Sequence, residues 1–191
     1  MTIVYLIRHG ETDWNIQGRY QGQADPPLNS AGIAQSEELA ALLAGEKIDL
    51  IYSSPLKRAL QTAEILSRRL SVEVILDPRL VEIHQGDWQT RLRSEIEVLY
   101  PKLLNDWETS PWEVSPPGGE SLAEVQRRVK AAMDDILEHH PRQRIAIVSH
   151  RIPIALIKVK YRGMDKETVR KIDLPNTSWE KIQIENLSTE P

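Results

Sequence analysis

Four short apolar runs rich in β-branched residues constrain the fold of this chain most. They lie at Ile3–Ile7, Ile48–Tyr52, Val72–Leu76 and Ile145–Ser149. Runs of this length and composition are typical of strands that are buried on both faces of a sheet. Helical patterns separate the runs, and alternation of strand and helix predicts an α/β fold whose strands pair mainly in parallel.

The helical patterns have recognisable ends. The capping box Ser121-Leu122-Ala123-Glu124 opens the clearest helix, predicted over Leu122–His139, in which apolar residues recur at helical spacing. Pro141 ends it. Shorter patterns predict a helix from Asn29-Ser30 to Gly45, a helix with Pro55 in its first turn, a helix after His150 and a last strand at Ser178–Ile184.

One segment interrupts this alternation. Residues 79–119 are polar and contain tryptophans and prolines, and we expect a lid or pocket wall there, within a single domain that spans residues 1–191. Trp88, Trp107 and Trp112 lie in this segment. They fit an apolar pocket wall or ordinary core aromatics, and the sequence leaves both interpretations open.

Composition excludes several classes of protein. The 191 residues contain no cysteine, which rules out a disulfide scaffold, a thiolate metal site and a cysteine nucleophile. The net charge of −4 argues against a nucleic-acid-binding surface. No apolar run approaches the roughly 20 residues of a membrane span, and the N-terminus lacks the features of a signal peptide. We therefore expect a cytoplasmic protein with no membrane or nucleic-acid partner.

The ends of the predicted strands bring together residues suited to phosphoryl chemistry. In open α/β sheets, ligands bind at the carboxyl ends of the strands. These ends supply Arg8, His9, Arg58 and His150, and the segment 79–119 adds Glu82. Guanidinium groups grip phosphate oxygens, a neutral imidazole can attack phosphorus, and a carboxyl group can protonate a leaving oxygen.

Each of these residues alone has an ordinary structural explanation, and only their convergence favours a site. Motifs of competing chemistries, GxxxxGK[ST] and GxSxG, are absent from the sequence. Metal-ligand spacing is absent as well. Zinc bound by the two histidines and Glu82 stays a minor alternative, because the two neighbouring arginines would repel a dication.

Six motifs follow one another along the chain. They are RHGETDWN from Arg8, GRYQGQADPPLNSAG from Gly18, YSSPLKRALQTAE from Tyr52, VEIHQGDW from Val81, PPGGESL from Pro116 and IVSH from Ile147. In this order and spacing they resemble the histidine phosphatase superfamily, in its phosphoglycerate mutase-like branch. The resemblance covers Ile3 to about Ile184 and implies a three-layer sandwich with a mainly parallel central sheet.

The resemblance also implies a role for each matching residue. His9 corresponds to the phosphoryl acceptor and Glu82 to the proton donor, while Arg8, Arg58 and His150 surround the transferred group. Further contacts to phosphate or substrate are implied for Asn15, Gln21, Gly22, His84, Gln85 and Arg151. The family works without a metal, and we expect no cofactor.

Three departures from the family pattern bear on the substrate. Arg151 follows His150 where many members have glycine, and it either contacts an anionic substrate group or points outward. Trp88 is followed by Gln-Thr instead of the frequent Glu-Gly. Metal-independent phosphoserine phosphatases carry a histidine three residues after the motif glutamate, where this chain has Gln85, which puts that route of carboxylate recognition in doubt.

Three functions remain open, with a phosphomonoesterase preferred. A phosphoglycerate mutase would carry an arginine at Ile83 and a longer basic insertion between Gly86 and Gly119. A non-catalytic phospholigand-binding protein would be favoured only by loss of a core residue, and none is lost. The substrate is expected among small phosphorylated metabolites: phosphoserine, sugar phosphates, phosphoglycerates or a cobalamin-precursor phosphate. The resemblance is also compatible with a homodimer.

Overall fold

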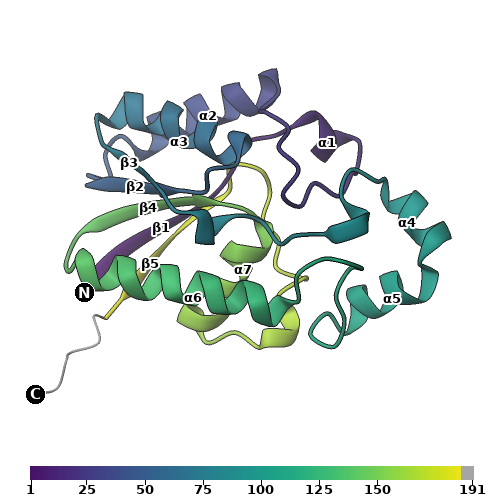
Figure 1. Cartoon of the computed structure of the whole chain (residues 1–191). Coiled ribbons are helices and arrows are strands. Elements are labelled where there is room, and N and C mark those ends of the chain that lie inside the picture. The colour runs from purple at the N-terminus through teal and green to yellow at the C-terminus, as the bar shows by residue number, and fades with distance from the viewer. Residues whose placement is uncertain (186–191) are drawn as a thin grey trace, which may run out of the picture.

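A five-stranded sheet forms the centre of the computed structural model, which describes residues 1–185 (Figure 1). Its strands are β1 (Thr2–Arg8), β2 (Leu50–Ser53), β3 (Val74–Leu76), β4 (Arg144–Ser149) and β5 (Trp179–Ile184), in the order β3-β2-β4-β1-β5. All neighbours pair in parallel except β5, which runs antiparallel to β1. The predicted α/β fold with a mainly parallel sheet is confirmed.

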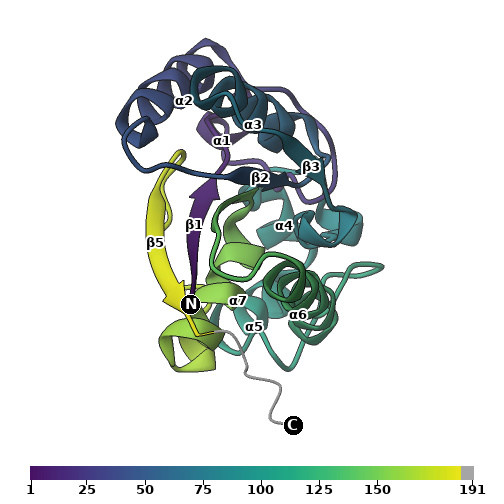
Figure 2. The ribbon, with the colours of Figure 1, turned by 90° about the vertical axis from the view of Figure 1, so that its left-hand side faces the viewer.

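Helices cover both faces of the sheet and complete three layers (Figures 1 and 2). Helices α2 (Ser30–Leu43) and α3 (Lys57–Leu70) lie on one face, and α6 (Leu122–His139) and α7 (Arg151–Arg162) on the other. Successive side chains of a strand point to opposite faces. In β1, Tyr5 and Ile7 therefore join the core under α2 and α3, while Val4 and Leu6 join the core under α6 and α7.

Most of the helix caps predicted from the sequence are present in the structure. The hydroxyl of Ser121 accepts a hydrogen bond from the Glu124 amide at 3.2 Å, and the carboxylate of Glu124 accepts one from the Ser121 amide at 2.8 Å. Helix α6 has the predicted bounds. The placement of Pro55 in a helix is wrong, because Leu56 keeps an extended backbone (φ −64°, ψ 133°) and α3 begins only at Lys57.

The segment 79–119 lies beyond the carboxyl ends of the strands (Figure 1). It contains two 3₁₀ turns, η2 (Gly86–Trp88) and the end of η1 (Pro78–Leu80), followed by α4 (Arg93–Leu99) and α5 (Pro101–Thr109). Trp88 and Trp107 are fully buried and pack edge-to-face, with ring centroids 6.3 Å apart. For these two, the core interpretation is the right one. No helix within residues 1–185 has both the length and the apolarity needed to cross a bilayer.

Candidate active site

The carboxyl ends of three parallel strands bring His9 and His150 together. The His9 amide donates to the carbonyl of Ser149 at 3.1 Å, and the Ser54 amide donates to that of Val148 at 3.0 Å, so the chain leaves β1, β2 and β4 side by side. The imidazole centroids of His9 and His150 lie 5.1 Å apart. Both rings are buried.

The hydrogen bonds of His9 determine its tautomer. Its Nδ1 lies 2.7 Å from the carbonyl oxygen of Gly10, and a carbonyl can only accept, so Nδ1 carries the proton. Nε2 then presents its lone pair and accepts a hydrogen bond from Arg58 Nε at 3.3 Å. Burial, followed by the charges of Arg58 and Arg8, holds the pKa of His9 well below its ordinary value. His9 is therefore a neutral imidazole with a nucleophilic Nε2.

His150 is neutral for similar reasons. Burial is the largest cause that lowers its pKa well below the ordinary value, and the charges of Arg58, His9 and Arg8 add to it. Its Nε2 lies 2.8 Å from the hydroxyl of Ser54. Its Nδ1 is buried and has no hydrogen-bond partner within residues 1–185. A polar atom buried in this way is suited to meet a group of a bound ligand.

Arg58 is the most tightly held cation of the site. Its side chain is 1% exposed, and its two terminal nitrogens donate to the carbonyls of Gly22 and Ala24, both at 2.8 Å. Burial lowers the pKa of Arg58 to about 10, so it stays charged at neutral pH. Gly22 has a φ of +53°, and a Cβ there would lie 2.5 Å from the side-chain oxygen of Gln89. Glycine is therefore required where this loop approaches Arg58.

Arg8 lies at the end of β1 and is largely buried. Its Nη1 donates to the carbonyl of Leu174, while its Nε is buried without a partner in the described chain. Burial is the largest cause that lowers the pKa of Arg8, and the charge of Glu82 acts in the opposite direction. The unpaired Nε gives the site a second guanidinium donor in addition to Arg58.

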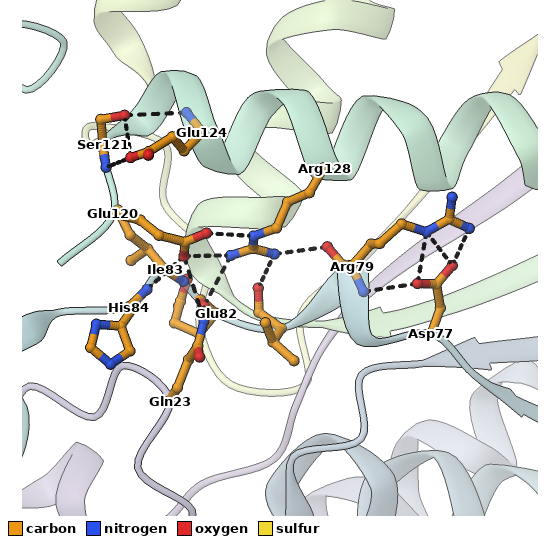
Figure 3. Close-up of polar contacts among 11 residues, drawn as sticks. Gln23, Asp77, Arg79, Glu82, Ile83, His84, Glu120, Ser121, Glu124 and Arg128 are labelled. Carbon is orange, nitrogen blue, oxygen red and sulfur yellow. Dashed lines mark hydrogen bonds and ion pairs between the residues drawn. The ribbon is translucent and has the colours of Figure 1, made fainter.

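Glu82 lies in the segment that follows η1 (Figure 3). One of its carboxylate oxygens accepts hydrogen bonds from the amides of Ile83 at 2.9 Å and Ile152 at 3.3 Å. Its charge raises the pKa of both Arg8 and Arg58, in opposition to the effect of their burial.

The remaining residues implied by the motifs have partners of several kinds. Asn15 is the third residue of helix α1 (Asp13–Ile16), and its Oδ1 accepts a hydrogen bond from the Thr12 amide at 3.0 Å. The side-chain oxygens of Gln21 and Gln85 are buried without partners in residues 1–185. His84 accepts from the Gly86 amide at Nδ1, at 3.2 Å, and so carries its proton on Nε2 when neutral.

Arg151 does not point outward. It is half-buried, and its Nη2 donates to the carbonyl oxygen of Arg170 at 2.5 Å. Of the two alternatives that the sequence left open, the outward-pointing side chain is therefore not observed, and contact with an anionic substrate group stays a prediction. The Arg170 loop leads into β5 at the same edge of the sheet as His9.

Two residues of this region, Asn176 and Arg128, were missed by reasoning from sequence. Asn176 donates through Nδ2 to the carbonyl of His9 at 3.1 Å, and to Asn15 Oδ1 at 3.3 Å. Arg128, on α6, pairs with Glu120 at 2.8 Å and also donates to the backbone carbonyl of Glu82 at 3.1 Å (Figure 3). Asn176 would have been found only if the antiparallel direction of β5 were known, and Arg128 had no local signal in the sequence.

Within the part of the chain that the structure describes, no three His, Asp or Glu side chains gather closely enough to hold a metal ion. His9, His150 and Glu82, the zinc alternative, therefore do not form such a group.

The sequence of this chain is similar to those of known proteins. Residues 4–190 match the family model described as the histidine phosphatase superfamily, branch 1. Phosphoserine phosphatase 1 of Hydrogenobacter thermophilus is 37% identical over 185 residues, which cover 97% of this chain and 88% of that protein. A protein of Proteus mirabilis named "probable phosphoglycerate mutase GpmB" is 35% identical over 190 residues, covering 97% and 86%.

Solved structures show the same likeness. YhfR of Bacillus stearothermophilus superposes with a TM-score of 0.91 at 31% identity, covering 97% of this chain and 92% of that one. A mycobacterial glucosyl-3-phosphoglycerate phosphatase superposes with a TM-score of 0.87 at 29% identity, covering 95% and 90%.

Proposed function

Because this chain belongs to the histidine phosphatase superfamily, as the six motifs implied, we propose that it hydrolyses phosphate monoesters of small metabolites through a phosphohistidine at His9. The observation that carries the mechanism is the state of His9. Its Nδ1 donates a hydrogen bond to the Gly10 carbonyl, and its Nε2 lone pair accepts one from Nε of Arg58. A nucleophile is thus held beside the charge that would bind the group it attacks.

The first step forms the phosphoenzyme. His9 Nε2 attacks phosphorus, the ester P–O bond breaks, and the carboxyl group of Glu82 gives its proton to the leaving oxygen. Arg8, Arg58 and His150 bind the oxygens of the phosphoryl group, where preorganised donors stabilise charge that develops in the transition state.

The second step releases inorganic phosphate. The carboxylate of Glu82 accepts a proton from water, the water oxygen attacks phosphorus, and the bond between phosphorus and His9 Nε2 breaks. His9 regains its lone pair and Glu82 its proton. Both side chains thus return to their initial protonation states.

We propose that the reaction needs no metal ion, because Arg8 and Arg58 already supply the positive charge that a cation would bring to the phosphoryl oxygens. The cytoplasmic location, the homodimer and the single domain with a lid at residues 79–119 stay predictions from the sequence.

A phosphoglycerate mutase is the second candidate, favoured by the relative from Proteus mirabilis. A mutase keeps the phosphoryl group on the enzyme and returns it to another hydroxyl. The residue after Glu82 is Ile83, which is fully buried in the core and brings no charge to the pocket. The phosphatase therefore remains the preferred function.

Phosphate release in excess EDTA tests the proposal. The substrates are phosphoserine, 3-phosphoglycerate, a sugar phosphate and p-nitrophenyl phosphate, and 2-phosphoglycerate formation is followed in parallel. We expect phosphate release without isomerisation, and its loss in His9→Asn. Isomerisation without release would identify a mutase. Turnover by His9→Asn close to that of wild type would rule out the phosphohistidine.

A further inference from the structure

Arg8, Arg151 and Arg170 form a row of arginines along the loop that precedes β5. Arg8 and Arg151 both donate to the loop before β5, Arg8 to the carbonyl of Leu174 and Arg151 to that of Arg170. Among residues 1–185, no carboxylate oxygen lies within ion-pair distance of Arg8, Arg151 or Arg170. None of the three therefore forms an ion pair in this part of the chain, although the charges of Glu82 and Asp173 act on Arg8 and that of Glu108 acts on Arg170.

Arg170 packs on a buried aromatic ring. Its guanidinium carbon lies 5.1 Å from the ring centroid of Trp107, which is fully buried. Burial is the largest cause that lowers the pKa of Arg170, and the charge of Arg151 lowers it further. The charge of Arg151 also acts on Arg8, so the three cations repel one another.

Half-buried like charges that form no ion pair are costly to the fold, and such clusters gather at functional sites. Guanidinium groups bind carboxylates and phosphates with paired hydrogen bonds. An anion bound beside Arg151 and Arg170 would relieve the repulsion. Because Arg8 belongs to both the row and the phosphoryl pocket, that anion and the phosphoryl group would lie next to each other.

We propose that Arg151 and Arg170 form a second anion subsite, which binds a carboxylate or a second phosphate of the substrate while Arg8 and Arg58 hold the phosphoryl group. The substrate is then a small phosphomonoester that carries another anionic group a few bonds away. This inference rests on the proposed function. It adds the substrate class and assigns Arg170, which no sequence motif includes, as a specificity-determining residue.

Substrate pairs that differ by one carboxylate test the subsite. Phosphoserine and phosphoethanolamine form one pair, and 3-phosphoglycerate and glycerol 3-phosphate another. We expect wild type to prefer the carboxylated member of at least one pair in kcat/KM. Arg151→Met and Arg170→Met should lower kcat/KM for that member by about 10- to 100-fold, the effect of losing charge-assisted hydrogen bonds, and should lower it much less for its partner.

Controls separate specificity from damage to the fold. Arg170→Lys keeps the charge beside Trp107 but not the paired donors, and should restore part of the preference. Arg127→Met, at an exposed position of α6, should leave the preference intact. Equal losses on both members of a pair, or no preference in wild type that hydrolyses p-nitrophenyl phosphate, would overturn the subsite alone. No hydrolysis of any ester by wild type would overturn the proposed function with it.

Discussion

Replacing Arg128 with methionine should destabilise the protein strongly and impair the positioning of Glu82. Arg128 donates to both carboxylate oxygens of Glu120 at 2.8 and 2.9 Å, and to three backbone carbonyls of the segment that carries the acid (Figure 3). Those carbonyls belong to Arg79 at 2.7 Å, Val81 at 2.7 Å and Glu82 at 3.1 Å. One side chain thus closes five hydrogen bonds around the acid segment.

The expected magnitude follows from burial. The side chains of Arg128 and Glu120 are only 18% and 22% exposed, so removal of the cation leaves a carboxylate largely withdrawn from water. Breaking a buried pair by deleting one partner costs about 3–5 kcal/mol of the free energy of unfolding. For a chain of this size, each kcal/mol corresponds to roughly 2–4 °C, and the melting temperature should fall by about 6–20 °C.

Thermal unfolding followed by circular dichroism measures this loss, and Arg127→Met on the same helix is the matched control, expected within about 0.5 kcal/mol of wild type. The double variant Glu120→Gln/Arg128→Met should lose less than the sum of the two single variants, because it leaves no unpaired charge. If Arg128→Met does not fold, Arg128→Lys should show an intermediate loss. A melting temperature of Arg128→Met within about 2 °C of wild type would refute the reasoning.

Two further outcomes are expected. Glu82→Gln should lower kcat for alkyl phosphates by about 100-fold or more, and that for p-nitrophenyl phosphate far less, because nitrophenolate leaves without protonation; equal losses in steady-state assays would contradict the acid role. Stability should also fall on acidification. Burial and the charge of Arg58 hold the pKa values of His9 and His150 far below the ordinary value, so both bind protons in the unfolded chain but not in the folded one. The free energy of unfolding should therefore be fully present above about pH 6.5 and decrease below it, by up to roughly 1.4 kcal/mol per pH unit for each histidine. Urea titrations between pH 7 and 5 measure this slope, which His139→Gln, at a helix end, should leave intact and which a flat profile would disprove.

The fold and the centre of the site could be predicted from sequence because each depends on local patterns. The apolar runs mark the parallel strands, and the strand-end rule then selects Arg8, His9 and His150 without further information. Strand boundaries were misplaced by one or two residues: β2 spans Leu50–Ser53 and β3 begins at Val74, later than the apolar runs. Strand boundaries depend on pairing with neighbours, which composition does not record.

Residues before β5 escaped prediction for a topological reason. The strand-end rule was applied to the carboxyl ends of parallel strands, but β5 is antiparallel to β1, so its amino end lies at the same edge. The loop that enters β5 carries Arg170 and Asn176 to the site from that direction. Sequence alone does not reveal the direction of a terminal strand, and the residues that precede it therefore read as surface loop.

The proposed nucleophile and the proposed acid depend on different kinds of support. His9 follows a seven-residue strand that is paired on both sides, so its position is fixed by the sheet itself. Glu82 lies in a stretch, residues 81–85, that has no helix or strand of its own, and its backbone carbonyls need donors from elsewhere. Arg128 supplies them from α6, and Glu120 binds the amide of His84 at 2.8 Å in the same network. The Arg128–Glu120 ion pair thus holds the backbone of Glu82 in place, as strand pairing holds that of His9. Arg128, which no sequence motif includes, therefore controls the position of the acid in the proposed proton transfer.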